Sequence, residues 1–190
     1  TPPSSPSSAD DTALEDATIT LEALRSARES AGASPTGQQV TAVTCPAGHP
    51  NPTHNDQCRA CGQAIVDRTP RTIPRPSLGR LRFADGTTTE LDRHLLIGRN
   101  PATDLKVSGE DTGRVRLADP DNVLSRTHVA IQLDGWQVQV IDRDSMNHTY
   151  VEIPGRPPFQ IRPGEPYPVP PGSTIRLGDE IGFVFEAEAT

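Results

Sequence analysis

The sequence has few basic residues, few aromatic residues and no long apolar segment. Its 18 Lys and Arg stand against 25 Asp and Glu, which gives a formal charge of −7. General binding to nucleic acid needs an excess of cations facing the phosphates, so this balance argues against it. No apolar run approaches the roughly 20 residues of a membrane helix, and no signal peptide is visible. We therefore expect no direct membrane insertion by this segment.

The small share of hydrophobic residues, 33% of the chain, and the uneven spread of 20 prolines and 15 glycines favour a compact part joined to linkers. Residues 1–40 are predicted to be disordered or weakly helical. They net −4, from two Arg against six Asp and Glu, and Leu14, Leu21 and Leu24 lie roughly on one helical face. A Cys-containing segment follows at 41–66, a linker rich in Pro and Arg at 67–78, and a β-rich region at 79–190.

The β-rich region is marked by short alternating apolar runs between turn residues. Asp85-Gly86 lies between two such runs and predicts a tight hairpin. The segments HVAIQL, WQVQVID, TYVEI, STIRLG and EIGFVFE continue the pattern with no apolar period of helix length. We therefore predict an all-β fold, a two-sheet antiparallel β-sandwich of about 110 residues.

All three cysteines of the chain lie in the segment 41–66. Together with one histidine they have the spacing C-x3-H-x8-C-x2-C, formed by Cys45, His49, Cys58 and Cys61. Two turn-borne pairs of ligands suit the tetrahedral coordination of Zn²⁺, and a polar segment this short needs such an ion to fold. The segment resembles a zinc ribbon of the CPxGHxN…CxxCG form. With four ligands filled, we expect a structural zinc ion and no catalysis.

The sequence offers two alternatives to this zinc site. His54 is a second candidate for the fourth ligand, although the CPxGH spacing favours His49. A redox-active CxxC with a spare cysteine needs a βαβ setting that the segment lacks. Zinc ribbons can also bind nucleic acid, but residues 41–78 net only +2, from four Arg against two Asp. The retained thiols indicate a reducing compartment, so we expect a cytoplasmic location.

Three polar stretches of the β-rich region are expected to meet at one end of the sandwich, because loops at the same end converge in space. They are LIGRNP with Gly98 and Arg99, VLSRTHV with Ser125 and His128, and DRDSMNHTYV with Asn147. In this order and strand context they resemble the forkhead-associated (FHA) domain, a phosphothreonine-binding β-sandwich. The chain as a whole, with the zinc ribbon before this region, resembles an actinobacterial-type FHA protein.

The resemblance implies a role for each matching residue. Arg99 is expected to bind the phosphate in charge-assisted hydrogen bonds, and Ser125 to donate its hydroxyl and a backbone N–H to it. Asn147 is expected to bind the main chain of the ligand. Thr149 and Arg126 are expected to add contacts near the phosphothreonine or its neighbours. Gly98 and His128 then support the site, Gly98 by permitting a close approach and His128 by bracing the loop of Ser125.

The chain departs from the family pattern in two places. His148 stands where the family usually has Gly between Asn and Thr, so it is expected to alter the loop or to touch the ligand. The segment before Ser125 is also long, with an added turn at 109–113.

An internal ligand is a further hypothesis, by analogy with related proteins that carry a phosphorylated N-terminal segment. Thr12, Thr18 and Thr20 lie in the acidic N-terminal segment, and Thr18 has Leu21 three residues on. Phosphorylation there would let the tethered segment occupy the chain's own site.

Together these features predict a phosphothreonine-binding adaptor in Ser/Thr protein kinase signalling, with no enzymatic activity. The alternative is a phosphate-independent scaffold that docks a larger assembly through the zinc ribbon. A hydrolase is the third class, and no plausible base and orienting acid accompany Ser125. The chain opens at Thr1 and not at methionine, so we also consider that it is the cytoplasmic part of a larger or membrane-associated protein.

Overall fold

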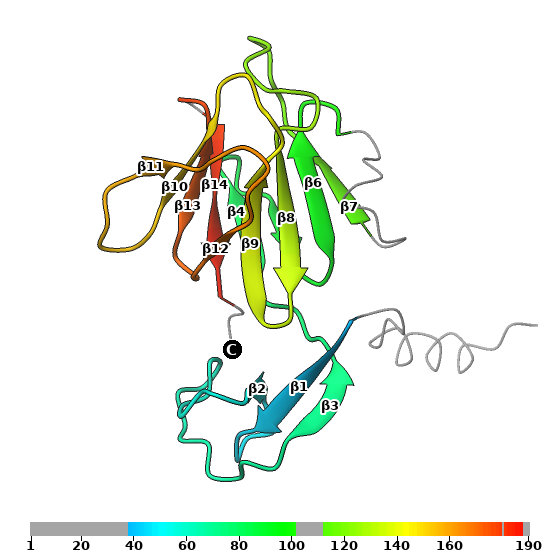
Figure 1. Cartoon of the computed structure of the whole chain (residues 1–190), viewed down its shortest axis with the longest axis vertical. Coiled ribbons are helices and arrows are strands. Elements are labelled where there is room, and N and C mark those ends of the chain that lie inside the picture. Colours follow the sequence, from blue (N-terminus) through cyan, green and yellow to red (C-terminus); the bar gives the residue numbers. More distant parts are fainter. Residues whose placement is uncertain (1–37, 102–111, 180, 188–190) are drawn as a thin grey trace, which may run out of the picture. The chain divides into compact units, whose positions relative to one another are not determined.

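The computed structural model describes residues 38–101, 112–179 and 181–187, and all regular elements in these ranges are β-strands (Figure 1). The predicted all-β class is confirmed. No helix in the described ranges is long and apolar enough to cross a membrane. The weak helix predicted within residues 1–40, with Thr12, Thr18 and Thr20, lies outside the described residues.

The first sheet belongs to the Cys-containing segment. Its order is β2-β1-β3, and both pairs are antiparallel, with bounds β1 (Gln39–Thr44), β2 (Pro50–Pro52) and β3 (Arg71–Pro74). Strand β3 lies in the segment predicted as a linker, so that segment supplies an edge strand. We call residues 38–74 the Cys/His module. Its buried cluster consists of Val43, Cys45, Cys58 and Ile65.

The other two sheets form the predicted sandwich. One has the order β11-β10-β13-β14-β4-β5, with bounds β4 (Arg80–Phe83), β5 (Thr88–Glu90), β10 (Thr149–Glu152), β11 (Phe159–Gln160), β13 (Thr174–Leu177) and β14 (Ile181–Glu186). The second has the order β12-β9-β8-β6-β7, with bounds β6 (His94–Gly98), β7 (Thr112–Arg116), β8 (Val129–Asp134), β9 (Gln137–Asp142) and β12 (Tyr167–Val169).

The sequence predicted an antiparallel sandwich, but one pair of strands in it is parallel. Strands β6 and β7 are parallel, with Gly98 opposite Arg116. A parallel pair needs a crossover connection of about a dozen residues, and residues 99–111 separate β6 from β7 in the sequence. The long segment before Ser125 therefore contributes an edge strand that runs beside Gly98.

The core of the sandwich lies between the two sheets. It contains Leu, Ile, Val and Phe side chains that alternate along the strands, with Leu81, Ile97, Val129 and Ile175 fully buried. The rings of Phe83 and Phe183 pack with centroids 5.4 Å apart. This apolar layer fixes the strand ends, and so the starting points of the loops.

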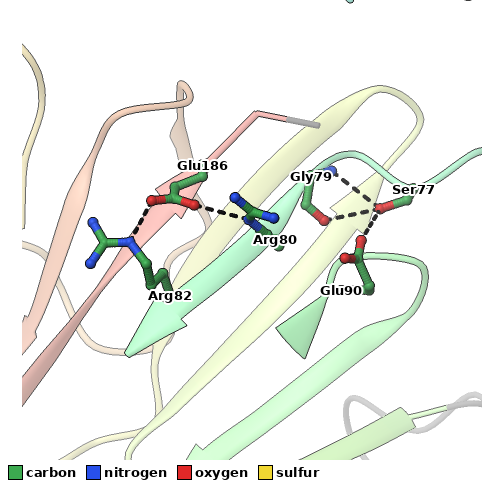
Figure 2. Close-up of polar contacts among 6 residues, drawn as sticks. All are labelled: Ser77, Gly79, Arg80, Arg82, Glu90 and Glu186. Carbon is green, nitrogen blue, oxygen red and sulfur yellow. Dashed lines mark hydrogen bonds and ion pairs between the residues drawn. The ribbon is translucent and has the colours of Figure 1, made fainter. Parts of the chain in front are cut away.

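The first and last strands of the sandwich are joined side by side. Strand β14 pairs with β4 in the main chain, and Figure 2 shows Glu186 between Arg80 and Arg82 on the exposed face. The Glu186 carboxylate accepts bonds from the Nε atoms of both arginines, at 2.9 Å and 2.5 Å. These donors lower the pKa of Glu186. Exposed ion pairs of this kind stabilise a fold only weakly.

Gly79 marks the entry into β4. Its φ is +134°, and a Cβ there would lie 2.2 Å from the carbonyl oxygen of Glu186, so no other residue fits without a shift. In Figure 2 the Ser77 hydroxyl lies beside Gly79, accepts its N–H at 3.3 Å and contacts Glu90 Oε2 at 3.0 Å. The start of the sandwich is therefore tightly bound to its last strand.

Candidate functional site

The Cys/His cluster predicted from spacing is assembled in the structure. The ligand atoms of Cys45, His49, Cys58 and Cys61 all lie within 4.8 Å of one another. His49 Nδ1 is 3.6 Å from Cys45 Sγ and 3.7 Å from Cys58 Sγ, and the Cys45 and Cys61 sulfurs are 3.9 Å apart. Ligands about 2.3 Å from one tetrahedral ion lie roughly 3.8 Å from each other. The four residues therefore fit a zinc-sized ion, and His54 is not in the cluster.

Two tight turns hold these ligands. In the first, Gly48 has a φ of +87° and donates its N–H to the Cys45 carbonyl at 2.9 Å. In the second, Gly62 has a φ of +70° and donates to the Cys58 carbonyl at 2.9 Å. Left-handed backbone at both positions favours glycine and lets the chain fold around the sulfurs.

Cys58 Sγ is set up to be a thiolate. Burial opposes its charge, but the N–H groups of Cys61 and Ala60, at 3.5 Å and 3.4 Å, and the Asn51 amide donate to the sulfur. Together they lower the pKa of Cys58 to about 6. Metal ions bind the thiolate form, so these donors favour coordination before any ion arrives.

Asn51 supports the cluster without being a candidate metal ligand. Its side chain is fully buried, and its Nδ2 donates to the His49 carbonyl at 2.8 Å and to Cys58 Sγ at 3.5 Å. Its Oδ1 accepts the Arg59 N–H at 2.8 Å. One amide therefore links the two turns. In the sequence, Asn51 is the Asn of the CPxGHxN motif, which is the feature that indicates its role.

Arg59, inside the second turn, contacts two residues outside the Cys/His module. Its Nη2 donates to the Leu78 carbonyl at 2.7 Å, and its guanidinium lies 5.6 Å from the ring centroid of Trp136. The Trp136 indole N–H donates to the Thr41 carbonyl of β1 at 2.9 Å. Trp136 is partly buried, packs against the core of the sandwich and also contacts the module.

The polar loops of the sandwich meet at one end, as the sequence predicted (Figure 1). Backbone bonds join the first two, from Arg99 N to the Ser125 carbonyl at 3.3 Å and from Asn100 N to the Arg126 carbonyl at 3.1 Å. A Cβ on Gly98 would lie 2.3 Å from the Arg126 carbonyl. Gly98 is therefore required for the two loops to approach.

The third loop contacts the second through two side chains. Met146 N donates to Ser125 Oγ at 3.2 Å, and Asn147 Nδ2 donates to the Val123 carbonyl at 2.8 Å. Ser125 Oγ thus accepts a bond and keeps its own hydrogen for another partner. Arg99, Arg126 and Asn147 are exposed, and the exposed Met146 adds apolar surface beside Ser125.

His128 lies buried beneath these loops. Its Nδ1 accepts the Ser125 N–H at 3.4 Å, and its Nε2 lies 3.1 Å from the His148 carbonyl, to which it donates in the matching tautomer. Burial lowers the pKa of His128 below its ordinary value, although the His148 carbonyl opposes this. The neutral ring with one donor and one acceptor therefore connects the second and third loops.

Thr149 is placed differently from the other predicted contact residues. It is fully buried, and its hydroxyl donates to Asp142 Oδ2 at 2.5 Å. The buried Asp142 carboxylate also accepts Ser145 Oγ at 2.6 Å and Ser145 N at 2.9 Å. Asp142 thus organises the loop that carries Asn147. His148 in this loop has a φ of +60°.

Asp119 and Arg116 were not selected from the sequence. Asp119 accepts the N–H groups of Val123 and Leu124 at 2.9 Å and 2.8 Å, which shapes the loop before Ser125. A polar hollow of about 660 Å³ opens beside Arg99. Its lining consists of Arg99, Asn100, Arg116, Leu117, Ala118, Asp119 and Asn122. Arg116 lies in the alternating run VRLADP, a pattern that indicates a strand but no functional side chain.

Comparison with known proteins identifies the sandwich. Residues 95–178 match the sequence model of the FHA domain, so the chain contains an FHA domain together with the Cys/His cluster. Only this binding domain is found, and no catalytic domain is identified. No curated protein matches the chain.

Several solved structures are similar to this chain. One, described as a study of phosphothreonine-dependent FHA domain interactions, is 26% identical and covers 60% of this chain and 100% of its own, with a TM-score of 0.41. The FHA domain of human APLF with an XRCC1 bisphospho peptide is 19% identical and covers 58% and 99%, with a TM-score of 0.43. Mycobacterium tuberculosis EmbR with a low-affinity phosphopeptide is 21% identical and covers 62% and 26%, with a TM-score of 0.45.

Proposed function

We propose that the FHA domain of this chain binds phosphothreonine peptides and acts as a non-enzymatic adaptor in Ser/Thr protein kinase signalling. The observation that carries the proposal is the convergence of Arg99, Ser125 and Asn147 on one end of a rigid sandwich. Backbone bonds between their loops hold these groups apart from the core and exposed to a ligand. Preorganised donors of this kind bind an anion without a large ordering cost.

Each group has a role that its contacts permit. The Arg99 guanidinium faces the phosphate with a planar set of donors. Ser125 Oγ already accepts the Met146 N–H, so its own hydrogen points to the phosphate. Asn147 uses one N–H on Val123 and keeps its carbonyl and second N–H for the ligand's main chain. Arg126 stands exposed at the rim, where it contacts the phosphate or a flanking residue.

Thr149 and His128 support the site from below. The Thr149 hydroxyl is committed to Asp142, so we propose that Thr149 positions the Asn147 loop through this bond. His128 fixes the backbone of Ser125 in the same way. A buried neutral imidazole that is held on both nitrogens is not a base for the Ser125 hydroxyl, which supports binding over hydrolysis.

We further propose that the Cys/His module is a structural zinc ribbon, with Zn²⁺ held by Cys45, His49, Cys58 and Cys61. The tetrahedral spacing of the ligand atoms and the donors to Cys58 support this. When bound, the ion supplies coordination energy to a module with a small core. A reducing, cytoplasmic location agrees with three free thiols.

Regulation by the acidic N-terminal segment is a separate part of the proposal, with Thr12, Thr18 or Thr20 as the phosphorylated residue. Its test compares phosphopeptide affinity before and after kinase treatment, for the full chain and for a chain without residues 1–40. We expect kinase treatment to weaken binding by the full chain only. Equal affinity for all four samples would contradict this regulation and leave the binding proposal intact.

Arg99→Ala tests the binding proposal at its central residue. Loss of charge-assisted bonds to a phosphate costs about 1.5–3 kcal/mol, so affinity for a phosphothreonine peptide is expected to fall at least tenfold. Arg156→Ala is the matched control, because Arg156 is exposed in the turn at the opposite end of β10. Equal affinity of both variants and the wild type would favour the phosphate-independent scaffold.

A further inference from the structure

The polar hollow beside Arg99 extends beyond the residues that are expected to bind the phosphate. Arg99 lines it, but Ser125 and Asn147 do not. Arg99 therefore belongs to both sets of residues, because its backbone N–H is bonded to the Ser125 carbonyl and the residue also lines the hollow. A volume of about 660 Å³ lies in the range of ligand pockets and exceeds what one phosphate group fills.

The parallel edge strand places Arg116 at this hollow. Arg116 is the last residue of β7 and stands opposite Gly98 in the register with β6. Leu117 N then donates to the Gly98 carbonyl at 2.9 Å, which fixes the backbone beyond Arg116. The exposed Arg116 side chain is therefore held next to Arg99 by main-chain geometry.

The charges around the hollow are not balanced within the described part of the chain. Its two guanidinium groups, from Arg99 and Arg116, make no ion pair with a residue that the structure describes. The carboxylate of Asp119 also lines the hollow, and both of its oxygens accept backbone N–H groups, from Val123 and Leu124. Two cations beside a shared hollow favour an anionic ligand group.

We propose that Arg116 recognises a second acidic side chain of the ligand, next to the phosphothreonine held by Arg99 and Ser125. The inference rests on the proposed function and adds a specificity residue to it. An aspartate, a glutamate or a second phosphorylated residue has the required chemistry, because the arginine fork binds carboxylate and phosphate alike. The ligand is thus a phosphothreonine segment with an acidic neighbour.

The experiment measures the affinity of a set of phosphothreonine peptides for the full chain. All flanking residues are alanine in the reference peptide, and a single aspartate is moved through the flanking positions in the others. For the wild type, we expect one acidic position to bind roughly tenfold more tightly than the reference. A doubly phosphorylated peptide with phosphoserine at that position separates a preference for phosphate from one for carboxylate.

Two variants assign that preference. Arg116→Ala is expected to remove it and to leave the affinity for the reference peptide within about twofold of the wild-type value. Arg114→Ala is the matched control, because Arg114 lies two residues earlier on β7, is exposed and does not line the hollow. Arg114→Ala is expected to keep the preference. Arg116→Glu is expected to move it from aspartate to lysine at the same position.

Three results would overturn the inference. They are a wild type with no acidic preference, a preference that survives in Arg116→Ala, and an equal loss for all peptides in Arg116→Ala. The last result would make Arg116 a second contact to the phosphothreonine itself. If the wild type binds no phosphopeptide in the set, and Arg99→Ala does not differ from it, the proposed function fails as well. The two failures are therefore distinguishable.

Discussion

The Cys/His module and the sandwich reach ordered structures by different physical means. The buried cluster of the module has four members, and two of them, Cys45 and Cys58, belong to the candidate metal site. The main cluster of the sandwich has nineteen buried members, all of them apolar. A small core cannot offset the entropy of ordering the chain, whereas a large one can. We therefore propose that metal coordination stabilises the first region, whereas apolar burial stabilises the second.

The difference extends to function. In the sandwich, core packing fixes the strand ends, and the polar loops are then free to present Arg99, Ser125 and Asn147 to a ligand. In the module, Cys45 and Cys58 belong both to the buried cluster and to the candidate metal site, so we propose that they hold the fold and leave no open position for chemistry. A substitution that unfolds one region should therefore leave the other region folded.

Removal of one metal ligand should have the largest effect. His49→Ala is expected to abolish stoichiometric zinc binding and to unfold the module alone, because structural zinc contributes on the order of 10 kcal/mol to such folds. Amide NMR spectra should lose dispersion for residues 38–74 and keep it for the sandwich. The fluorescence of Trp136, the single tryptophan, should also change, since Arg59 lies over its ring.

His54→Ala is the control for this change, because His54 is exposed and outside the cluster. It should bind zinc as the wild type does. A module that stays folded after zinc is chelated, or that loses zinc through His54→Ala, would contradict the account of this region.

Truncation of a core side chain should have the next largest effect, and in the other region. Phe183→Ala removes a buried ring that packs on Phe83, so the free energy of unfolding of the sandwich should fall by about 3–5 kcal/mol. Denaturant unfolding followed by circular dichroism measures this loss. Zinc content should not change. A parallel loss of zinc would mean that the two regions fold as one unit.

A fall in pH should weaken the sandwich through His128. The folded-state pKa of this residue is lowered, so the unfolded chain binds the proton more readily. Stability from His128 is present above the ordinary pKa of about 6.5 and is lost as pH falls through that value toward the folded pKa, by up to about 1.4 kcal/mol per pH unit. NMR titration of the His128 ring checks the cause. A midpoint at or above the ordinary value would contradict it.

The smallest effect is expected at His148. Its φ of +60° is costly for a residue with a side chain, so His148→Gly should raise the free energy of unfolding by up to about 1 kcal/mol. Thermal unfolding measures the change. His148→Val should instead lower the melting temperature, because a β-branched residue tolerates this backbone poorly. If glycine destabilises the chain, the His148 side chain contributes more than the strain costs.

Much of the fold was predictable from short-range patterns. Alternation and turn residues predicted the sandwich, the Asp85-Gly86 hairpin corresponds to the β4–β5 pair, and spacing predicted the cluster of Cys45, His49, Cys58 and Cys61. The parallel β6–β7 pair was not predicted, because the pairing partner of an edge strand depends on its crossover and not on its own alternation. The strand at Arg71–Pro74 was missed for a related reason, since prolines obscured an edge strand.

The residues of the candidate site also fall into those that the sequence predicts and those that it does not. Arg99, Ser125 and Asn147 were found because a family pattern links loops that are distant in the sequence. Arg116 was missed because its position depends on the parallel pairing with β6, and Asp142 because its partners Ser145 and Thr149 become evident only when the loop is folded. The buried location of Thr149 was also not evident, since it depends on the same carboxylate.

The central claim is tested most directly by titrating the full chain with a matched pair of threonine peptides, one phosphorylated and one not, at fixed salt. The account predicts saturable binding of the phosphorylated peptide, at least tenfold tighter than that of its partner, with amide NMR shifts at Arg99, Ser125 and Asn147. Equal affinity for the two peptides, or shifts confined to the Cys/His module, would contradict it.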